Sequence, residues 1–163
     1  MIIGDKIAYI NQLWQLVLEH AVGDMDLYNE LKRQYTEDEW VKLREKVFDG
    51  LPKYTRIEKY YNEEKLYDRL LECVLKSNGL YMLQQYEKVL KDKYPEQLLS
   101  KYKTELEAMS RHSADRKHYS DIAAMLRRMK EINGGTKLAI QIIDEWRIKY
   151  KNRPAMMDEL NKV

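Results

Sequence analysis

Residues 36–52 read TEDEWVKLREKVFDGLP, which contains the start, the apolar face and the end of one helix. Thr36 and Glu39 have the spacing of a capping box, in which each side chain accepts a hydrogen bond from the other residue's backbone N–H. The apolar side chains that follow recur at helical spacing and are Trp40, Leu43, Val47 and Leu51. Pro52 ends the run, because proline disfavours helical geometry in the residue before it. This segment predicts an amphipathic helix with one buried face.

The same helical spacing recurs along the rest of the chain. We expect further helices over residues 5–22, 53–62, 63–76, 80–93 and 95–111, and others that open at Asp24, Ser113, Thr136 and Arg153. The expected N-caps are Asp5, Ser113 and Thr136, whose side chains can accept from free backbone N–H groups. Pro95 and Pro154 fall in first turns, where the missing N–H of proline costs nothing. The pattern predicts about nine helices.

Most of the expected connections are roughly two to five residues long, so consecutive helices must lie antiparallel to each other. A pair of helices recurs about every 30 to 40 residues, in the range of tetratricopeptide repeats. The sequence therefore predicts an all-α protein, with residues 1–163 as a single helical-repeat domain. Its architecture would be a tetratricopeptide-like α-solenoid of antiparallel helical hairpins. No strict repeat signature accompanies this period, and a closed helical bundle is the alternative.

Composition fits a folded domain and excludes several classes of protein. The chain has 163 residues, of which 44% are hydrophobic and 34% charged, a balance typical of a globular domain. No apolar run approaches the roughly 18 to 20 residues of a membrane-spanning helix, and no basic segment precedes the first apolar residues as in a signal peptide. Cys73 is the one cysteine and has no partner for an intrachain disulfide. We therefore expect a cytoplasmic protein without a membrane partner.

Residues able to carry chemistry are few and scattered. His20, His112 and His118 do not have the spacing of about three or four residues that a helical metal site requires. Cys73 lies in an apolar stripe, where a thiol usually packs as a small hydrophobe. We expect no catalytic residue, no metal and no cofactor, and an unrecognised hydrolase is the weakest function considered.

Charge is unevenly distributed along the chain. Residues 1–99 hold 15 basic and 18 acidic side chains, whereas residues 100–163 hold 14 basic and 9 acidic ones. Six basic residues flank the two ends of the helix expected after Ser113 and form a candidate patch for nucleic acid or an acidic partner: Arg111, Arg116, Lys117, Arg127, Arg128 and Lys130. Acidic residues interleave with this basic patch, so a solvated helix face is the simpler interpretation.

From Tyr94 onward, the order of residues is more specific than helical spacing alone. It includes RKHY at residues 116–119, IAAMLRRM at residues 122–129 and RPAMMDEL at residues 153–160. This region resembles the helical C-terminal region of bacterial SWIM zinc-finger proteins, whose chains typically finish on a similar Arg-Pro-Ala pattern. The resemblance implies a tetratricopeptide-like scaffold attached to a zinc module thought to contact DNA or protein.

The zinc module itself has no counterpart in this chain. Its finger requires a CxC…CxH set of ligands, and one cysteine cannot provide that set. Zinc binding and DNA binding are therefore not transferred to these residues. The resemblance implies either the C-terminal part of a longer protein or a separate relative without the finger.

The function favoured by these observations is a non-catalytic helical-repeat scaffold for protein–protein interaction. Nucleic-acid binding through the basic patch is the alternative. The last residues are expected to form a docked C-terminal cap, since a solenoid leaves an apolar end that a terminal element must cover. The residues assigned to this cap are Arg153, Pro154, Met156, Met157 and Leu160.

Overall fold

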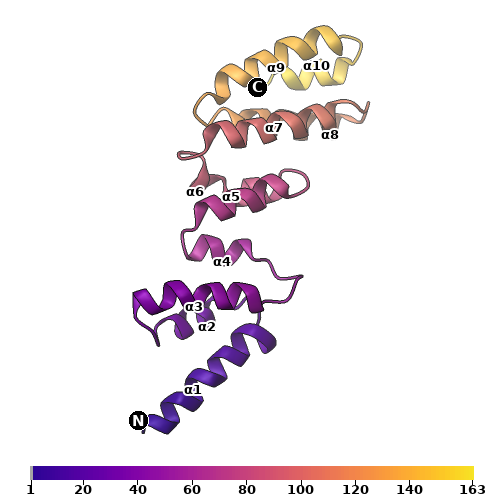
Figure 1. Cartoon of the computed structure of the whole chain (residues 1–163). Coiled ribbons are helices and arrows are strands. Elements are labelled where there is room, and N and C mark those ends of the chain that lie inside the picture. The colour runs from indigo at the N-terminus through magenta and orange to yellow at the C-terminus, as the bar shows by residue number, and fades with distance from the viewer. Residues whose placement is uncertain (1) are drawn as a thin grey trace. The chain divides into compact units, whose positions relative to one another are not determined.

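The computed structural model describes residues 2–163, and its ribbon consists of helices joined by loops and turns (Figure 1). Ten α-helices and one short π-helix are present within these residues, which contain no β-strand. The predicted all-α class is therefore confirmed. The chain divides into two compact units, the first ending at Leu70 and the second beginning at Leu71, and each is described by itself.

The first unit contains α1 (Ile3–Gln15), the π-helix η1 (Leu16–His20), α2 (Met25–Lys32), α3 (Glu37–Gly50), α4 (Glu58–Glu63) and the start of α5 (Tyr67–Lys76). α1 packs against α2, and η1 packs against both α2 and α3. The buried core residues are Leu13, Val17, Tyr28, Leu31, Trp40, Val47, Phe48 and Tyr60. Tyr28 is central, because its ring meets Trp40 and Tyr60 edge-on at centroid distances of 5.3 and 5.0 Å.

Two helix starts in the first unit follow the sequence signals. Asp24 Oδ1 accepts from the backbone N–H groups of Asp26 and Leu27 at 3.0 and 3.1 Å, which caps α2. The capping box of α3 forms, with the Thr36 N–H donating to Glu39 at 2.9 Å and the Glu39 N–H donating back to Thr36 Oγ1 at 3.4 Å. Both caps satisfy N–H groups that have no partner within their helix.

The first helix differs from the prediction at both ends. α1 begins at Ile3, and Asp5 lies inside its first turn instead of capping it, because the Asp5 N–H already bonds to the Ile2 carbonyl at 3.0 Å. The predicted helix to Val22 is interrupted, since its last turn widens into η1, where the Ala21 N–H reaches back to the Leu16 carbonyl at 2.7 Å.

The predicted helices over residues 53–62 and 63–76 were wrong in their boundaries. Residues 53–57 form turns, α4 extends only over Glu58–Glu63, and α5 starts at Tyr67. The break between them is at Lys65, the one non-glycine among the described residues with positive φ, at 54°. Neither glycine nor proline marks this break in the sequence, so helical spacing alone could not locate it.

The second unit continues with α6 (Tyr81–Leu90), α7 (Pro95–Ser110), α8 (Arg116–Met129), α9 (Gly135–Lys149) and α10 (Pro154–Leu160). α6 packs against α7, α7 against α8, and α8 against α9, while α7 also contacts α9 and α8 also contacts α10. Prominent buried side chains are Leu83, Leu98, Tyr102, Leu106, Ile122, Leu126, Met129, Ile142, Trp146, Met156 and Leu160. Pro95 and Pro154 occupy first turns as predicted.

Two predicted N-caps of the second unit are displaced by neighbouring residues. Asp115, not Ser113, caps α8, since its Oδ1 accepts from the His118 N–H at 2.9 Å. Gly134, not Thr136, precedes α9, because the chain turns there with a φ of 83° that favours glycine. Within residues 2–163, no helix is both long and apolar enough to cross a membrane.

Candidate functional site

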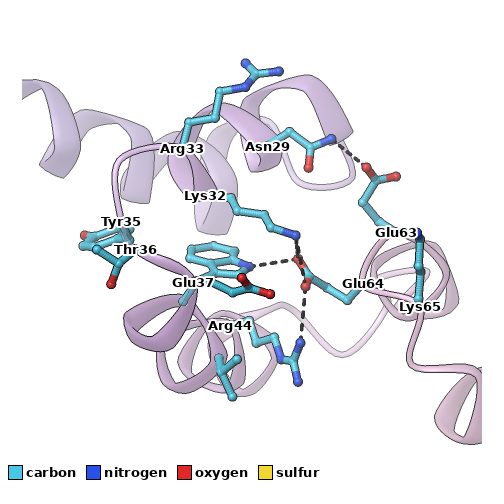
Figure 2. Close-up of a pocket in the computed structure, with 12 residues that line it drawn as sticks. Asn29, Lys32, Arg33, Tyr35, Thr36, Glu37, Arg44, Glu63, Glu64 and Lys65 are labelled. Carbon is cyan, nitrogen blue, oxygen red and sulfur yellow. Dashed lines mark hydrogen bonds and ion pairs between the residues drawn. The ribbon is translucent and has the colours of Figure 1, made fainter.

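A polar pocket of about 690 Å³ lies on the first unit, bordered by α2, the start of α3 and the end of α4 (Figure 2). Its lining combines basic, acidic and aromatic side chains with one aliphatic residue. The residues are Asn29, Lys32, Arg33, Tyr35, Thr36, Glu37, Trp40, Val41, Arg44, Glu63, Glu64 and Lys65. None of the residues to which the sequence assigns a candidate functional role lies in this pocket.

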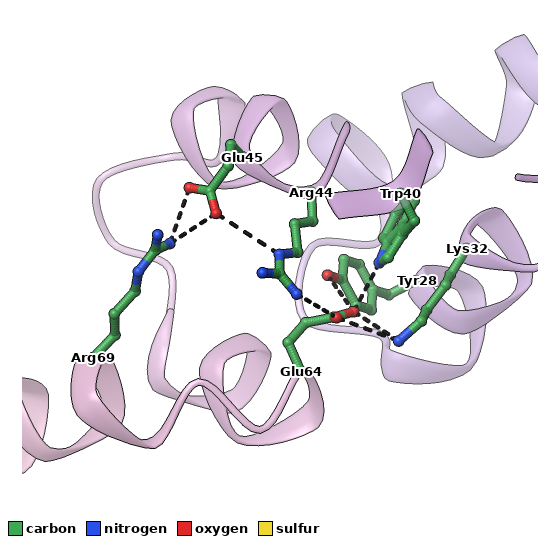
Figure 3. A network of polar contacts seen from close by, with 7 residues as sticks. All are labelled: Tyr28, Lys32, Trp40, Arg44, Glu45, Glu64 and Arg69. Atoms are coloured by element: carbon green, nitrogen blue, oxygen red, sulfur yellow. Dashed lines mark hydrogen bonds and ion pairs between the residues drawn. The ribbon is translucent and has the colours of Figure 1, made fainter. Parts of the chain in front are cut away.

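Glu64 is the centre of the pocket's hydrogen bonds, and four donors converge on its carboxylate (Figure 3). Oε1 accepts from the Tyr28 hydroxyl at 3.0 Å, the Trp40 indole at 2.9 Å and Lys32 Nζ at 3.1 Å. Oε2 accepts from Lys32 at 3.3 Å and from Nη1 of Arg44 at 3.4 Å. One carboxylate thus joins α2 and α3 to the end of α4.

The Glu64 side chain is 3% exposed, so these donors, in place of water, stabilise its negative charge. Burial acts to raise its pKa, but the hydrogen bonds from Trp40, Lys32 and Tyr28, with the charge of Lys32, hold the pKa of Glu64 below its usual value. The same site raises the pKa of Tyr28, through burial first and then through the negative charge of Glu64. Glu64 is therefore ionised at neutral pH and already engaged.

Arg44 is less well satisfied than Glu64. Its Nε is buried without a hydrogen-bond partner, and the nearest carboxylate oxygen, on Glu45, lies 3.7 Å away. Its contact with Glu64 at 3.4 Å is long for a charged hydrogen bond. Glu45 is held instead by Arg69 at 2.9 Å. The guanidinium therefore retains donor capacity at the pocket.

The outer part of the pocket is of mixed charge. Glu63 accepts from the Asn29 amide at 2.8 Å, and Arg33 pairs with Glu30, outside the lining, at 2.9 Å. Glu37 and Lys65 also border the opening. One wall is aromatic, because the Tyr35 ring stacks on Trp40 with centroids 6.2 Å apart.

The predicted basic patch is distributed over the end of α7 and the two ends of α8. Arg116 pairs with Glu159 and Asp158 at 3.1 and 3.0 Å, and Arg128 pairs with Glu87 at 2.7 Å. Lys130 and Arg127 donate to the carbonyls of Val163 and Lys162 at 2.8 and 3.4 Å. Arg111 and Lys117 are exposed and make no side-chain hydrogen bond or ion pair within residues 2–163. Four of the six basic side chains therefore hold parts of the second unit together.

Arg128 belongs to a buried polar group. Its partner Glu87 is 6% exposed and also accepts from the Tyr102 hydroxyl at 2.6 Å. Burial, followed by the hydrogen bond to Glu87, raises the pKa of Tyr102. Nη2 of Arg128 donates to the Gln84 carbonyl at 2.8 Å, so the guanidinium links α8 to α6.

The residues assigned to the C-terminal cap lie on α10 and at its start. Met156 and Leu160 are 1% and 2% exposed, and α10 packs against α8. Met157 is half-buried. Arg153, just before Pro154, donates to the Ser110 carbonyl at 2.6 Å and lies over the Tyr150 ring. These contacts tie the last helix to α7 and α8.

The histidines and the cysteine are not brought together. No group of three His, Cys, Asp or Glu side chains suited to a metal ion occurs within residues 2–163. His118 Nε2 lies 2.9 Å from the Met109 carbonyl, whereas His20 and His112 are exposed. Cys73 is half-buried on α5.

Models of protein families, curated proteins and solved structures give no match to this chain.

Proposed function

We propose that the chain is a non-catalytic helical scaffold that binds a partner protein, with helices arranged as a tetratricopeptide-like array of antiparallel hairpins. The observation that carries this proposal is the packing order of the second unit. α7 packs against α8 and α9, and α8 packs against α9 and α10. Contact with the next helix and the one after it is the arrangement by which helical repeats stack.

The electrostatics of the first unit support binding rather than catalysis. A general base needs a carboxylate that is free to accept a proton near the working pH. Glu64 instead has a lowered pKa and receives four donors. The pocket thus combines a fixed floor with charged and aromatic side chains around its opening, a surface suited to a protein segment.

The resemblance of the region from Tyr94 onward to the C-terminal region of SWIM zinc-finger proteins agrees with a scaffold role. That resemblance concerns the helical part only, so we propose no zinc ligand in this chain. We propose a cytoplasmic protein whose partner is another protein.

Affinity capture with the whole chain as bait tests the scaffold function. Proteins captured from a lysate of the source organism are purified and titrated against the chain by calorimetry. The proposal expects at least one to bind with saturable, stoichiometric heat. It is contradicted if no captured protein binds once purified.

Nucleic-acid binding is the second candidate, and the exposure of Arg111 and Lys117 near the start of α8 is the observation that favours it. Fluorescence anisotropy with labelled DNA over a salt series tests it, because phosphate contacts release counterions and make affinity fall steeply with salt. The variant to use is Arg111→Glu with Lys117→Glu. Reversal of Arg128 would confound the test, since it would place two carboxylates together at buried Glu87. Equal, weak binding by both proteins would exclude this function.

A further inference from the structure

The floor of the pocket carries more positive charge than its one buried carboxylate neutralises. Lys32 and Arg44 approach Glu64 from two sides (Figure 2). Tyr28 and Trp40 both donate to Oε1 of Glu64, whereas Oε2, the oxygen that faces Arg44, accepts from Lys32 at 3.3 Å and from Arg44 at 3.4 Å. Arg44 also lies 3.7 Å from Glu45, a carboxylate that Arg69 already engages with two hydrogen bonds, so Lys32, Arg44 and Arg69 share two carboxylates and one positive charge is left over.

Arg44 is the residue best placed to use that charge. A guanidinium has five N–H donors in a planar fork that fits a carboxylate. Within residues 2–163, the guanidinium of Arg44 makes a single hydrogen bond, the one of 3.4 Å to Glu64, and its Nε has none. Its side chain is only 18% exposed, so water replaces the missing acceptors poorly. An anion in the pocket would accept from the Nη groups of Arg44, which make only the one long contact with Glu64.

The acidic side chains around the pocket favour a single carboxylate over a nucleic acid as the bound anion. Glu37 and Glu63 border the same pocket, and residues 1–70 hold 11 basic against 14 acidic side chains. A nucleic acid would bring a row of negative charges against these carboxylates, whereas one carboxylate on a peptide can reach the floor alone. The stacked rings of Tyr35 and Trp40 offer a wall for the methylene groups of such a side chain.

We propose that this pocket binds a glutamate or aspartate side chain of a partner peptide, with Arg44 and Lys32 as the residues that pair with its carboxylate. This inference rests on the proposed scaffold function and names the chemistry of the segment that is bound. Trp40 reports on the site, because its indole N–H donates to Glu64 beside both cations.

The test is a titration of the ¹⁵N-labelled whole chain with a capped peptide that carries one glutamate among uncharged residues. The same peptide with glutamine in place of that glutamate is the control. The glutamate peptide is expected to shift the Trp40 indole N–H resonance in a saturable way, and the glutamine peptide to leave it in place. Equal shifts with both peptides, or none with either, overturn the proposal.

Substitutions of two residues on α3 identify which side chain binds the peptide carboxylate. Arg44→Gln should weaken binding about tenfold, the loss of one charged hydrogen-bonded pair. Arg44→Lys keeps the charge without the fork and should lie between Arg44→Gln and the wild type. Lys46→Gln removes the same charge from the exposed side of α3, outside the pocket lining, and should change binding less than about twofold. Equal weakening by Arg44→Gln and Lys46→Gln would show a general charge effect and overturn the site.

Two further outcomes separate this inference from its alternatives. Tighter binding of single-stranded DNA at the Trp40 resonance would assign the pocket to nucleic acid instead. A purified partner protein that binds the wild type and Arg44→Gln equally would contradict binding of its carboxylate in this pocket, but it would still support the scaffold function.

Discussion

The Trp40 indole donates to Oε1 of Glu64 at 2.9 Å, which joins the start of α3 to the C-cap residue of α4. Both partners are buried, so neither finds an equivalent partner in water without local opening of the fold. The pair holds the floor of the pocket in one position. The stability of the first unit and the geometry of the site therefore depend on the same contact.

Replacement of Glu64 with Gln should destabilise the first unit by about 3 kcal/mol, because it leaves the charges of Lys32 and Arg44 without their buried counterion. Urea unfolding followed by circular dichroism measures this change. Glu63→Gln is the matched control, since Glu63 makes one exposed hydrogen bond to Asn29 and should cost less than about 0.5 kcal/mol. Equal effects of the two variants would contradict the role assigned to Glu64.

Glu64 also makes the free energy of unfolding of the first unit depend on pH in the acidic range. A carboxyl group whose pKa is lower in the folded chain contributes stability that is present above its unfolded pKa, near 4.3, and is lost as the pH falls through the folded value. The lowered pKa of Glu64 therefore predicts a falling urea midpoint between about pH 5 and pH 3. Glu159, whose pKa is lowered chiefly by the hydrogen bond from Lys162, acts in the same direction in the second unit.

Glu64→Gln should reduce this acid dependence, because the amide does not titrate. The measurement is the difference in urea midpoint between pH 5 and pH 3 for the wild type, Glu64→Gln and Glu63→Gln. The wild type and Glu63→Gln are expected to lose more stability than Glu64→Gln. Parallel profiles for all three would mean that Glu64 has the same pKa in the folded and unfolded chain.

The C-terminal helix α10 should stabilise the second unit through the buried side chains of Met156 and Leu160. Leu160→Ala is expected to cost about 2 to 4 kcal/mol, as for other buried leucines, and truncation after Asn152 should lower the melting temperature by several degrees. Met157→Ala, on the half-buried side of the same helix, should cost less than about 1 kcal/mol. An unchanged melting curve for the truncated chain would show that α10 contributes nothing to the fold.

Gly135 at the start of α9 should not tolerate a side chain. A Cβ atom there would overlap the Met129 carbonyl, so Gly135→Ala must displace backbone and should lower the melting temperature. Gly4, inside α1, has open space around the same position. Gly4→Ala should be neutral or stabilising by up to about 1 kcal/mol, because alanine is the better helix former. Thermal unfolding of both variants checks the contrast, and equal loss by both would contradict it.

Local signals predicted the parts of the fold that depend on neighbouring residues. The capping box of Thr36 and Glu39 and the first-turn prolines Pro95 and Pro154 act within one turn of helix, so their spacing carries the information. Choice among nearby caps was less predictable. Ser113 and Asp115 can both accept from a helix start, and Asp115 is the one whose carboxylate reaches the His118 N–H.

The candidate site could not be predicted because its contacts are distant in sequence. Glu64 is adjacent to Glu63 and Lys65, a run typical of a solvated surface, yet it binds donors 20 to 36 residues away. Lys65, which ends this segment, has a positive φ of the kind that usually requires glycine, so no glycine in the sequence marks the turn. Arg116 and Arg128 differ from their sequence-based prediction in the opposite direction. As basic residues they suggest an exposed binding surface, yet they are paired with Glu159 and Glu87.

Calorimetric titration of the whole chain with its purified partner protein, for the wild type, Arg44→Gln and Lys46→Gln, tests the central claim most directly. The account predicts saturable binding by the wild type, about tenfold weaker binding by Arg44→Gln and a change of less than about twofold for Lys46→Gln. Binding of DNA but of no purified protein, with the DNA affinity lost in the Arg111→Glu and Lys117→Glu double variant, would contradict it.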